Sequence, residues 1–113
     1  MPHLDTASLA TAAAARGILL LDFTATWCGP CRVMKPVLES LATEYAAQGV
    51  RVAAVDVDAE PALAQRYDVR SMPTCVILRD GREVGRIVGS RPRAFVAGVL
   101  DRALAGDVAI AAP

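Results

Sequence analysis

Apolar runs alternate along the chain with segments whose apolar residues recur at helical spacing. The run Ile18–Thr24 is apolar on both of its alternating faces except at one acidic position, which is typical of a central strand covered on both sides. Residues 50–57 show a similar pattern, and two short runs, 75–78 and 83–88, flank the turn signal Asp80-Gly81. We therefore predict four strands, the last two joined as an antiparallel hairpin.

The longest helical pattern starts just after the motif Trp27-Cys28-Gly29-Pro30-Cys31 and ends at Gly49. Its polar residues lie mostly opposite a stripe of apolar residues, which are Met34, Val37, Leu38, Leu41 and Tyr45. Pro36 lies inside this helix and lacks the N–H that would reach the carbonyl four residues earlier. We therefore expect Pro36 to kink the helix axis.

Start and stop signals indicate three further helices. Asp5 can cap a helix over residues 7–15, which is expected to pack weakly because it holds few large apolar residues. Residues 61–67 begin with proline and predict a short helix, and Pro92 opens a last helix that Gly106 closes. The order αβαβαββα predicts an α/β fold with a mixed sheet and helices on both faces.

Composition limits the number of domains and the kinds of partner. The chain has 113 residues, of which 54% are apolar and 21% charged, so it can form one core and is not a disordered chain. Twelve basic residues balance twelve acidic ones, so we expect neither a nucleic-acid surface nor a polybasic membrane patch. We take residues 1–106 as a single domain and the alanine-rich residues 107–113 as a flexible C-terminal tail.

No stretch of the sequence has the pattern of a membrane span or a secretory signal. The most apolar stretch, residues 9–25, contains Arg16 and Asp22, which disfavour a span. The first ten residues contain Asp5 and no lysine or arginine, unlike a signal peptide. We therefore expect a cytoplasmic protein, in which a cysteine pair reacts rather than braces the fold.

Two of the three cysteines, Cys28 and Cys31, are three residues apart where the central strand has ended and the long helix begins. Unpaired N–H groups and the helix dipole at that end stabilise a thiolate, which lowers the thiol pKa toward neutrality. Cysteines at this spacing share a helix face and can close a disulfide and reopen it. The alternatives are half of a zinc site completed by Cys75 and His3, a structural bridge, or two inert thiols.

The chain resembles the thioredoxin family over residues 17–104. The five residues 27–31 match the active-site motif of that family. The accompanying matches are Asp22-Phe23, Pro36, Met72-Pro73-Thr74, Asp80-Gly81 and Gly89. The resemblance implies a thioredoxin fold and a protein-disulfide reductase in which Cys28 is the exposed nucleophile and Cys31 resolves the mixed disulfide.

Asp22 is the one acidic residue in its apolar strand, so desolvation is expected to raise its pKa. It could alternatively reach water or a backbone donor. The resemblance implies instead that Asp22 is a buried acid beside Cys31, with which it exchanges a proton. In the family the proline matching Pro73 is in the cis form and lies against the cysteines.

The same resemblance implies a small, nearly uncharged surface that docks the substrate, formed by Trp27, Gly29, Pro30, Met72, Pro73 and Gly89. For Met72 and Trp27 the alternative is an ordinary core position. Cys75 is expected to be a small apolar core residue, with a regulatory thiol as the alternative. His3 is expected to lie in a fraying terminus without a role.

Two positions and the amino-terminal segment depart from the family pattern. Thr24 stands where many members carry an aromatic residue, and Ala54 where many carry a lysine near the buried acid. Without that cation the pKa of Asp22 is expected to be higher. The amino-terminal edge strand is reduced to residues 1–4 or absent, which gives a sheet of four strands or five.

The resemblance also implies how the protein is supplied with electrons. We expect no metal and no bound cofactor, and electrons that come from NADPH through a thioredoxin reductase. The partners would be that reductase and disulfide-containing proteins, with neither nucleic acid nor membrane, and the chain is expected to be a monomer. The alternatives are a thioredoxin-like binding or assembly subunit, and a disulfide isomerase or oxidant.

Overall fold

The computed structural model describes residues 1–106, so the predicted tail at 107–113 lies outside the described residues. The strands are β1 (Ile18–Thr24), β2 (Val50–Asp56), β3 (Thr74–Arg79) and β4 (Arg82–Val88). The helices are α1 (Thr6–Ala14), α2 (Gly29–Tyr45), α3 (Pro61–Arg66) and α4 (Arg93–Leu104), with a 3₁₀ turn η1 (Ala46–Gln48) after α2. Every predicted element is present, most with bounds that differ by one or two residues.

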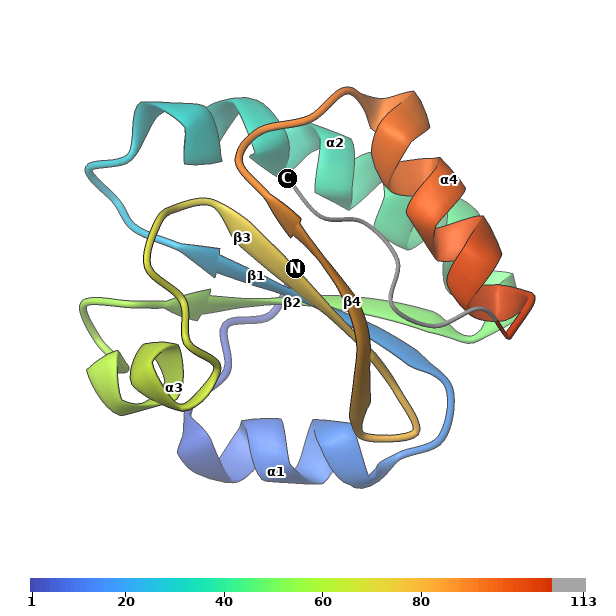
Figure 1. Cartoon of the computed structure of the whole chain (residues 1–113), viewed down its shortest axis with the longest axis horizontal. Coiled ribbons are helices and arrows are strands. Elements are labelled where there is room, and N and C mark those ends of the chain that lie inside the picture. The colour runs from blue at the N-terminus through green and yellow to red at the C-terminus, as the bar shows by residue number, and fades with distance from the viewer. Residues whose placement is uncertain (107–113) are drawn as a thin grey trace.

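The strands form one mixed sheet in the order β2-β1-β3-β4. β1 is parallel to β2 and antiparallel to β3, and β3 and β4 form the predicted antiparallel hairpin. α2 and α4 cover one face of the sheet, and α1 and α3 cover the other (Figure 1). The predicted α/β architecture with helices on both faces is therefore confirmed.

Alternation along β1 divides its side chains between two cores. Ile18 and Leu20 belong to the cluster beneath α2 and α4, whereas Leu19, Leu21 and Phe23 belong to the cluster that includes Leu9 of α1 and Leu63 of α3. Every residue of β1 except the last is buried, as expected for a central strand. The same alternation turns Asp22 toward the α2 face.

The amino-terminal segment is paired with the sheet. The amide of Leu4 donates to the carbonyl of Ala54, and the amide of Ala54 donates to the carbonyl of Pro2, at 2.8 and 2.7 Å. His3 forms an isolated parallel bridge with Ala54, which is what remains of an edge strand. The expectation that His3 frays was wrong, because these backbone bonds hold the segment on β2.

Local signals mark the ends of the helices. Asp5 caps α1 by accepting from the Ser8 amide at 2.8 Å, and Leu9 is the one fully buried residue of this helix, as the sparse apolar pattern indicated. α2 continues through Pro36 to Tyr45. No helix within residues 1–106 has the length and hydropathy that crossing a membrane requires.

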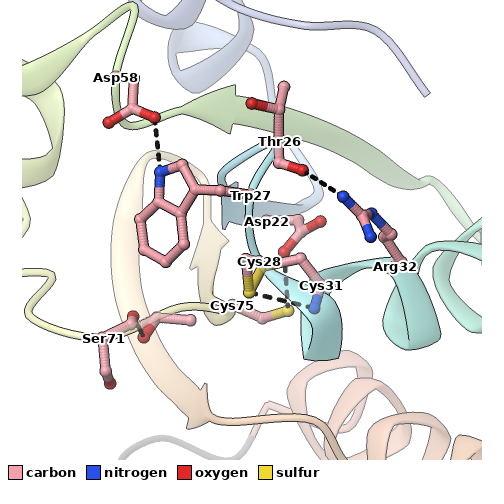
Figure 2. Close-up of a disulfide and its surroundings, with 10 residues drawn as sticks. Asp22, Thr26, Trp27, Cys28, Cys31, Arg32, Asp58, Ser71 and Cys75 are labelled. Atoms are coloured by element: carbon pink, nitrogen blue, oxygen red, sulfur yellow. Dashed lines mark hydrogen bonds between the residues drawn. A yellow bond between two sulfur atoms is a disulfide. The ribbon is translucent and has the colours of Figure 1, made fainter.

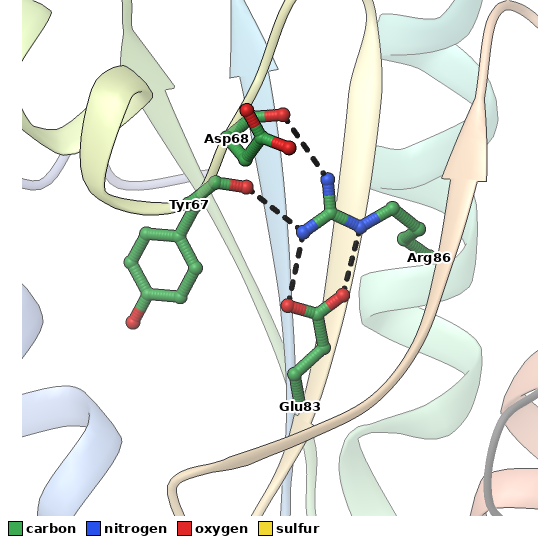
Figure 3. A network of polar contacts seen from close by, with 4 residues as sticks. All are labelled: Tyr67, Asp68, Glu83 and Arg86. Atoms are coloured by element: carbon green, nitrogen blue, oxygen red, sulfur yellow. Dashed lines mark hydrogen bonds and ion pairs between the residues drawn. The ribbon is translucent and has the colours of Figure 1, made fainter.

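Arg86 of β4 holds the segment that leads from α3 into β3. Its guanidinium pairs with both carboxylate oxygens of Glu83, at 2.7 and 3.0 Å, and donates to the carbonyl of Tyr67 at 2.8 Å and to that of Asp68 at 3.4 Å (Figure 3). That segment continues to Met72 and β3. The network therefore holds in place the stretch of chain that leads into one side of the candidate site.

Candidate active site

The sheet brings four connecting segments to one edge. β1 and β2 are parallel and end together, with Thr24 paired to Asp56. β3 begins at the same edge, since Phe23 pairs with Thr74, and β4 ends there, since Thr74 pairs with Val88. The cysteine motif after β1, the loop after β2, Pro73 before β3 and Gly89 after β4 therefore meet at this edge.

Cys28 and Cys31 form a disulfide at the start of α2, with their Cα atoms 5.3 Å apart. Cys28 is the N-cap of the 17-residue helix, and its sulfur accepts from the Cys31 amide at 3.2 Å (Figure 2). Pro30 lies in the first turn, where its missing N–H has no helical partner. This geometry places Cys28 Sγ where free amides and the helix dipole favour an anion.

The expectation that Cys28 is exposed is wrong for the disulfide form. Cys28 is 4% exposed and Cys31 3% exposed. Both belong to a small cluster with Ala25, against which Met72 and Val57 pack. Each sulfur is covered by its bonded partner and by these neighbours, so burial does not distinguish the two cysteines. Their positions at the helix start do distinguish them.

Trp27 forms an exposed rim beside the disulfide. Its side chain is 63% exposed, so the alternative of a core position is contradicted. Its indole Nε1 donates to Asp58 Oδ2 at 2.8 Å, and Asp58 lies in the loop after β2 (Figure 2). Arg32 donates to the carbonyl of Thr26 at 2.9 Å and so braces the loop from the other side. Sequence reasoning missed both contacts, because that of Asp58 depends on how two loops meet in space and that of Arg32 on how its side chain turns back from α2 to the preceding loop.

The Met72–Pro73 peptide bond is cis, as the resemblance implied. Met72 is half-buried and packs against the cysteine cluster, so it is neither a free surface residue nor a full core residue. The carbonyl of Pro73 accepts from the Gly89 amide at 2.8 Å. Pro73 itself is buried and Gly89 is half-buried, whereas Gly29 and Pro30 are exposed, so the predicted docking residues lie around one edge of the sheet with unequal exposure.

Asp22 is 1% exposed, and burial raises its pKa from 3.8 to about 6. The direction agrees with the expectation from its apolar strand. A hydrogen bond from the Cys75 thiol to Asp22 Oδ1, 3.9 Å between the heavy atoms, lowers the pKa in part (Figure 2). Cys75 is fully buried in the core as predicted, but its contact with Asp22 was not anticipated.

A pocket of about 230 Å³ is lined by Asp22 and Cys31 together. The small side chain of Ala54, which pairs with Asp22 across β1 and β2, contributes to this space. The remaining lining residues are Met1, His3, Thr24, Ala25, Thr26, Arg32, Lys35 and Asp56. The sequence-predicted acid and resolving cysteine are therefore brought to one cavity, and His3, expected to have no role, lines it too.

The four candidate zinc ligands do not come together as a set in this arrangement. Cys28 and Cys31 are bonded to each other, Cys75 is buried on β3, and His3 lies beside β2. Within residues 1–106 there is no group of three or more histidine, cysteine or acidic side chains arranged to hold a metal ion. The chemistry that this arrangement supports is reversible thiol–disulfide exchange.

Comparisons with known proteins agree with that chemistry. The sequence model of the thioredoxin family matches residues 3–102. Thioredoxins of Staphylococcus aureus strains Mu50 and MW2 are each 44% identical over 88 residues, which span 78% of this chain and 84% of theirs. Mitochondrial thioredoxin 3 of Saccharomyces cerevisiae, solved in its oxidized form, is 36% identical with a TM-score of 0.80 over 89% of this chain and 94% of that one. Thioredoxin of Plasmodium falciparum has a TM-score of 0.83 at 22% identity, over 90% and 98% of the two chains, which shows likeness of fold.

Proposed function

This chain belongs to the thioredoxin family and reduces protein disulfides by dithiol–disulfide exchange through Cys28 and Cys31, and we propose the order in which its residues act. In this proposal Cys28 is the attacking sulfur, Cys31 the resolving sulfur and Asp22 the proton acceptor. The observation that supports this order is the position of Cys28 Sγ at the N-cap of α2, where it accepts a hydrogen bond from the Cys31 amide. A thiolate there is stabilised before any substrate binds.

The exchange proceeds in two displacements. The Cys28 thiolate attacks one sulfur of the target disulfide, so that a mixed disulfide forms and the other target sulfur leaves as a thiolate. Cys31 then gives its proton to Asp22, and its thiolate attacks Cys28 Sγ. The second target thiolate leaves, two electrons have passed to the target, and the Cys28–Cys31 disulfide seen in the structure is the product. The second step is intramolecular, which makes it fast relative to attack by a free thiol.

The substrate docks on the rim around the disulfide. Trp27, Gly29 and Pro30 supply its exposed side, and Met72, Pro73 and Gly89 supply the side formed by β3 and β4. These six residues carry no formal charge, so the surface suits an extended, weakly polar segment that flanks a target cysteine. Extended backbone next to the disulfide brings the two reacting sulfurs within reach.

The disulfide is returned to two thiols by an external donor. We assign this step to a thioredoxin reductase that uses NADPH, with the chain acting as a monomer that binds no cofactor. A dithiol carrier of this kind works in a reducing compartment, so we place it in the cytoplasm. Its substrates are proteins whose disulfides are accessible to an extended docking mode.

Two measurements test these assignments. Insulin-disulfide reduction is followed with dithiothreitol as donor and then with NADPH plus a thioredoxin reductase. Activity with both donors is expected; activity with dithiothreitol alone would reject the reductase and keep the exchange chemistry.

The matched pair Cys28→Ser and Cys31→Ser tests the order of the two sulfurs. Cys31→Ser is expected to accumulate a mixed disulfide with the target, because the resolving sulfur is absent, whereas Cys28→Ser is expected to form none. Mass spectrometry under non-reducing conditions detects the adduct. The reverse result, with the adduct in Cys28→Ser, would assign the attack to Cys31.

A further inference from the structure

Cys75 lies directly opposite Asp22 in the pairing of β1 with β3. Residues opposite each other in an antiparallel pair project to the same face, so both side chains lie beneath α2. The Cys75 thiol donates to Asp22 Oδ1, with 3.9 Å between sulfur and oxygen (Figure 2). Cys75 has no accessible surface and Asp22 is 1% exposed, so water does not compete freely for this contact.

The other charged or titratable groups near Asp22 lie on the side of the pocket that it lines. Ala54 of β2, which lies opposite Asp22 on the other side of β1, has no polar side chain. The titratable or charged groups of the residues that line the pocket are Cys31, Arg32 and Lys35 of α2, Asp56 of β2, and His3 and the α-amino group of Met1 in the amino-terminal segment. Within residues 1–106, the side-chain hydrogen bond that reaches the Asp22 carboxylate comes from Cys75.

We propose that Cys75 is a positioning residue for the exchange reaction: its thiol holds the Asp22 carboxylate in its ionised form and in a fixed orientation. A thiol donates to a carboxylate more strongly than to a neutral carboxyl group, so the contact favours the form that accepts a proton from Cys31. This inference rests on the proposed role of Asp22. Cys75 itself neither gains nor loses electrons or a proton in the exchange.

The contact between Cys75 and Asp22 also keeps the Cys75 thiol protonated, so that it can donate a hydrogen bond. Burial, together with the neighbouring charge of Asp22, raises the pKa of the Cys75 thiol well above 9.0. The thiol therefore stays protonated over the pH range in which Asp22 changes its charge. It also stays a poor nucleophile, which limits mispairing with Cys28 or Cys31.

The direct test is the titration of Asp22 by carboxyl ¹³C NMR in the disulfide form, in which neither Cys28 nor Cys31 titrates. The proteins are the wild type, Cys75→Ala, Cys75→Ser and the control Ile87→Val. Ile87 is fully buried and pairs with Cys75 across β3 and β4, so the control loosens the same packing without removing the donor. Urea unfolding of each variant confirms that it is folded at the titration temperature.

The titration midpoint of Asp22 is expected to rise by about 0.5 pH unit in Cys75→Ala, a threefold change in its ionisation ratio. Cys75→Ser keeps a donor and is expected to restore most of the shift, and Ile87→Val is expected to leave the midpoint unchanged. Equal midpoints in wild type and Cys75→Ala would overturn the inference. So would a lower midpoint in Cys75→Ala, which would mean that water replaces the thiol.

A second readout separates this inference from the role proposed for Asp22. The rate at which Cys31 resolves a mixed disulfide is measured from pH 5 to 9 in the same variants, and its pH profile is expected to shift with the Asp22 midpoint. A shifted midpoint with an unshifted rate profile would support the Cys75–Asp22 contact and reject Asp22 as the proton acceptor. An unshifted midpoint would reject the Cys75 contact and leave the Asp22 role standing.

Discussion

Replacing Asp22 with asparagine is expected to make the protein more stable at neutral pH and to have little effect in acid. The Asp22 carboxyl is 1% exposed, and its position opposite Ala54 gives it no cationic partner on β2. Asparagine has nearly the same shape and keeps an oxygen that accepts from the Cys75 thiol. The substitution therefore removes the charge and little else.

The magnitude follows from the pKa of Asp22, which burial raises from 3.8 to about 6. Between these values the folded protein holds a proton that the unfolded chain has lost, so the free energy of unfolding falls as pH rises. At about 1.36 kcal/mol per unit, the loss reaches about 3 kcal/mol above pH 6 and stays constant at higher pH. Below pH 3.8 both states are protonated and the penalty is absent.

Urea unfolding of the disulfide form at half-unit steps from pH 4 to pH 8 measures this difference. The free energy of unfolding of Asp22→Asn should exceed that of the wild type by about 2–3 kcal/mol at pH 7.5, and the gap should close toward pH 4. Glu39→Gln is the control, because Glu39 is exposed on α2 and its replacement should change stability by only a few tenths of a kcal/mol. An Asp22→Asn variant no more stable than the wild type at pH 7.5, or a gap independent of pH, would refute the reasoning.

Three further predictions concern neighbouring groups. Ala54→Lys would place an ammonium group beside Asp22, in the pocket that both residues line, and is expected to lower the Asp22 pKa by about 1 unit. Carboxyl ¹³C NMR measures this pKa, and an unchanged value would mean that the lysine side chain does not enter the pocket. The Cys75 thiol should resist iodoacetamide at pH 8 in the folded disulfide form and react fully in urea, as mass spectrometry would show; equal rates would contradict its buried, protonated state. Asp58→Ala removes the hydrogen-bond partner of the Trp27 indole and should change the tryptophan emission. It should also slow attack on insulin by two- to fivefold, since about 0.5–1 kcal/mol of hydrogen bonding that positions Trp27 is lost. An unchanged rate would mean that substrate attack does not depend on this hydrogen bond.

The sequence indicated most of the fold because its signals are local. The apolar run Ile18–Thr24 and the turn Asp80-Gly81 each specify their element without reference to distant residues, and both were confirmed. Which strands become neighbours is a long-range property, so the antiparallel pairing of β1 with β3 was not predicted. Of the two alternatives for the amino-terminal segment, a reduced edge strand at residues 1–4 or none, the structure shows the reduced form, as the pairing of residues 2–4 with Ala54. Its partner on β2 could not be predicted for the same reason, since few apolar residues mark that segment.

The site shows the same division between local and long-range information. The N-cap position of Cys28 and the raised pKa of Asp22 follow from neighbours in sequence, so both could be anticipated. The contacts of Asp22 with Cys75 and of Trp27 with Asp58 join residues 53 and 31 positions apart, and only strand register and loop packing create them. The burial of Cys28 was missed because the disulfide and Met72 cover its sulfur, which the surface-turn signal of Gly29-Pro30 does not reveal.

Because burial raises the pKa of Asp22 to about 6, its charged form is expected to oppose folding at neutral pH, and its presence therefore calls for an explanation other than stability. The burial that disfavours the charged form also brings the pKa of Asp22 to about 6, within reach of the pH at which a thiol must release its proton. Without the Cys75 thiol the pKa of Asp22 is expected to be higher still, because the hydrogen bond from that thiol lowers it. Asp22 and Cys31 line one pocket, so the proposed role of Asp22 as the proton acceptor in the resolving step would account for the stability lost at this position.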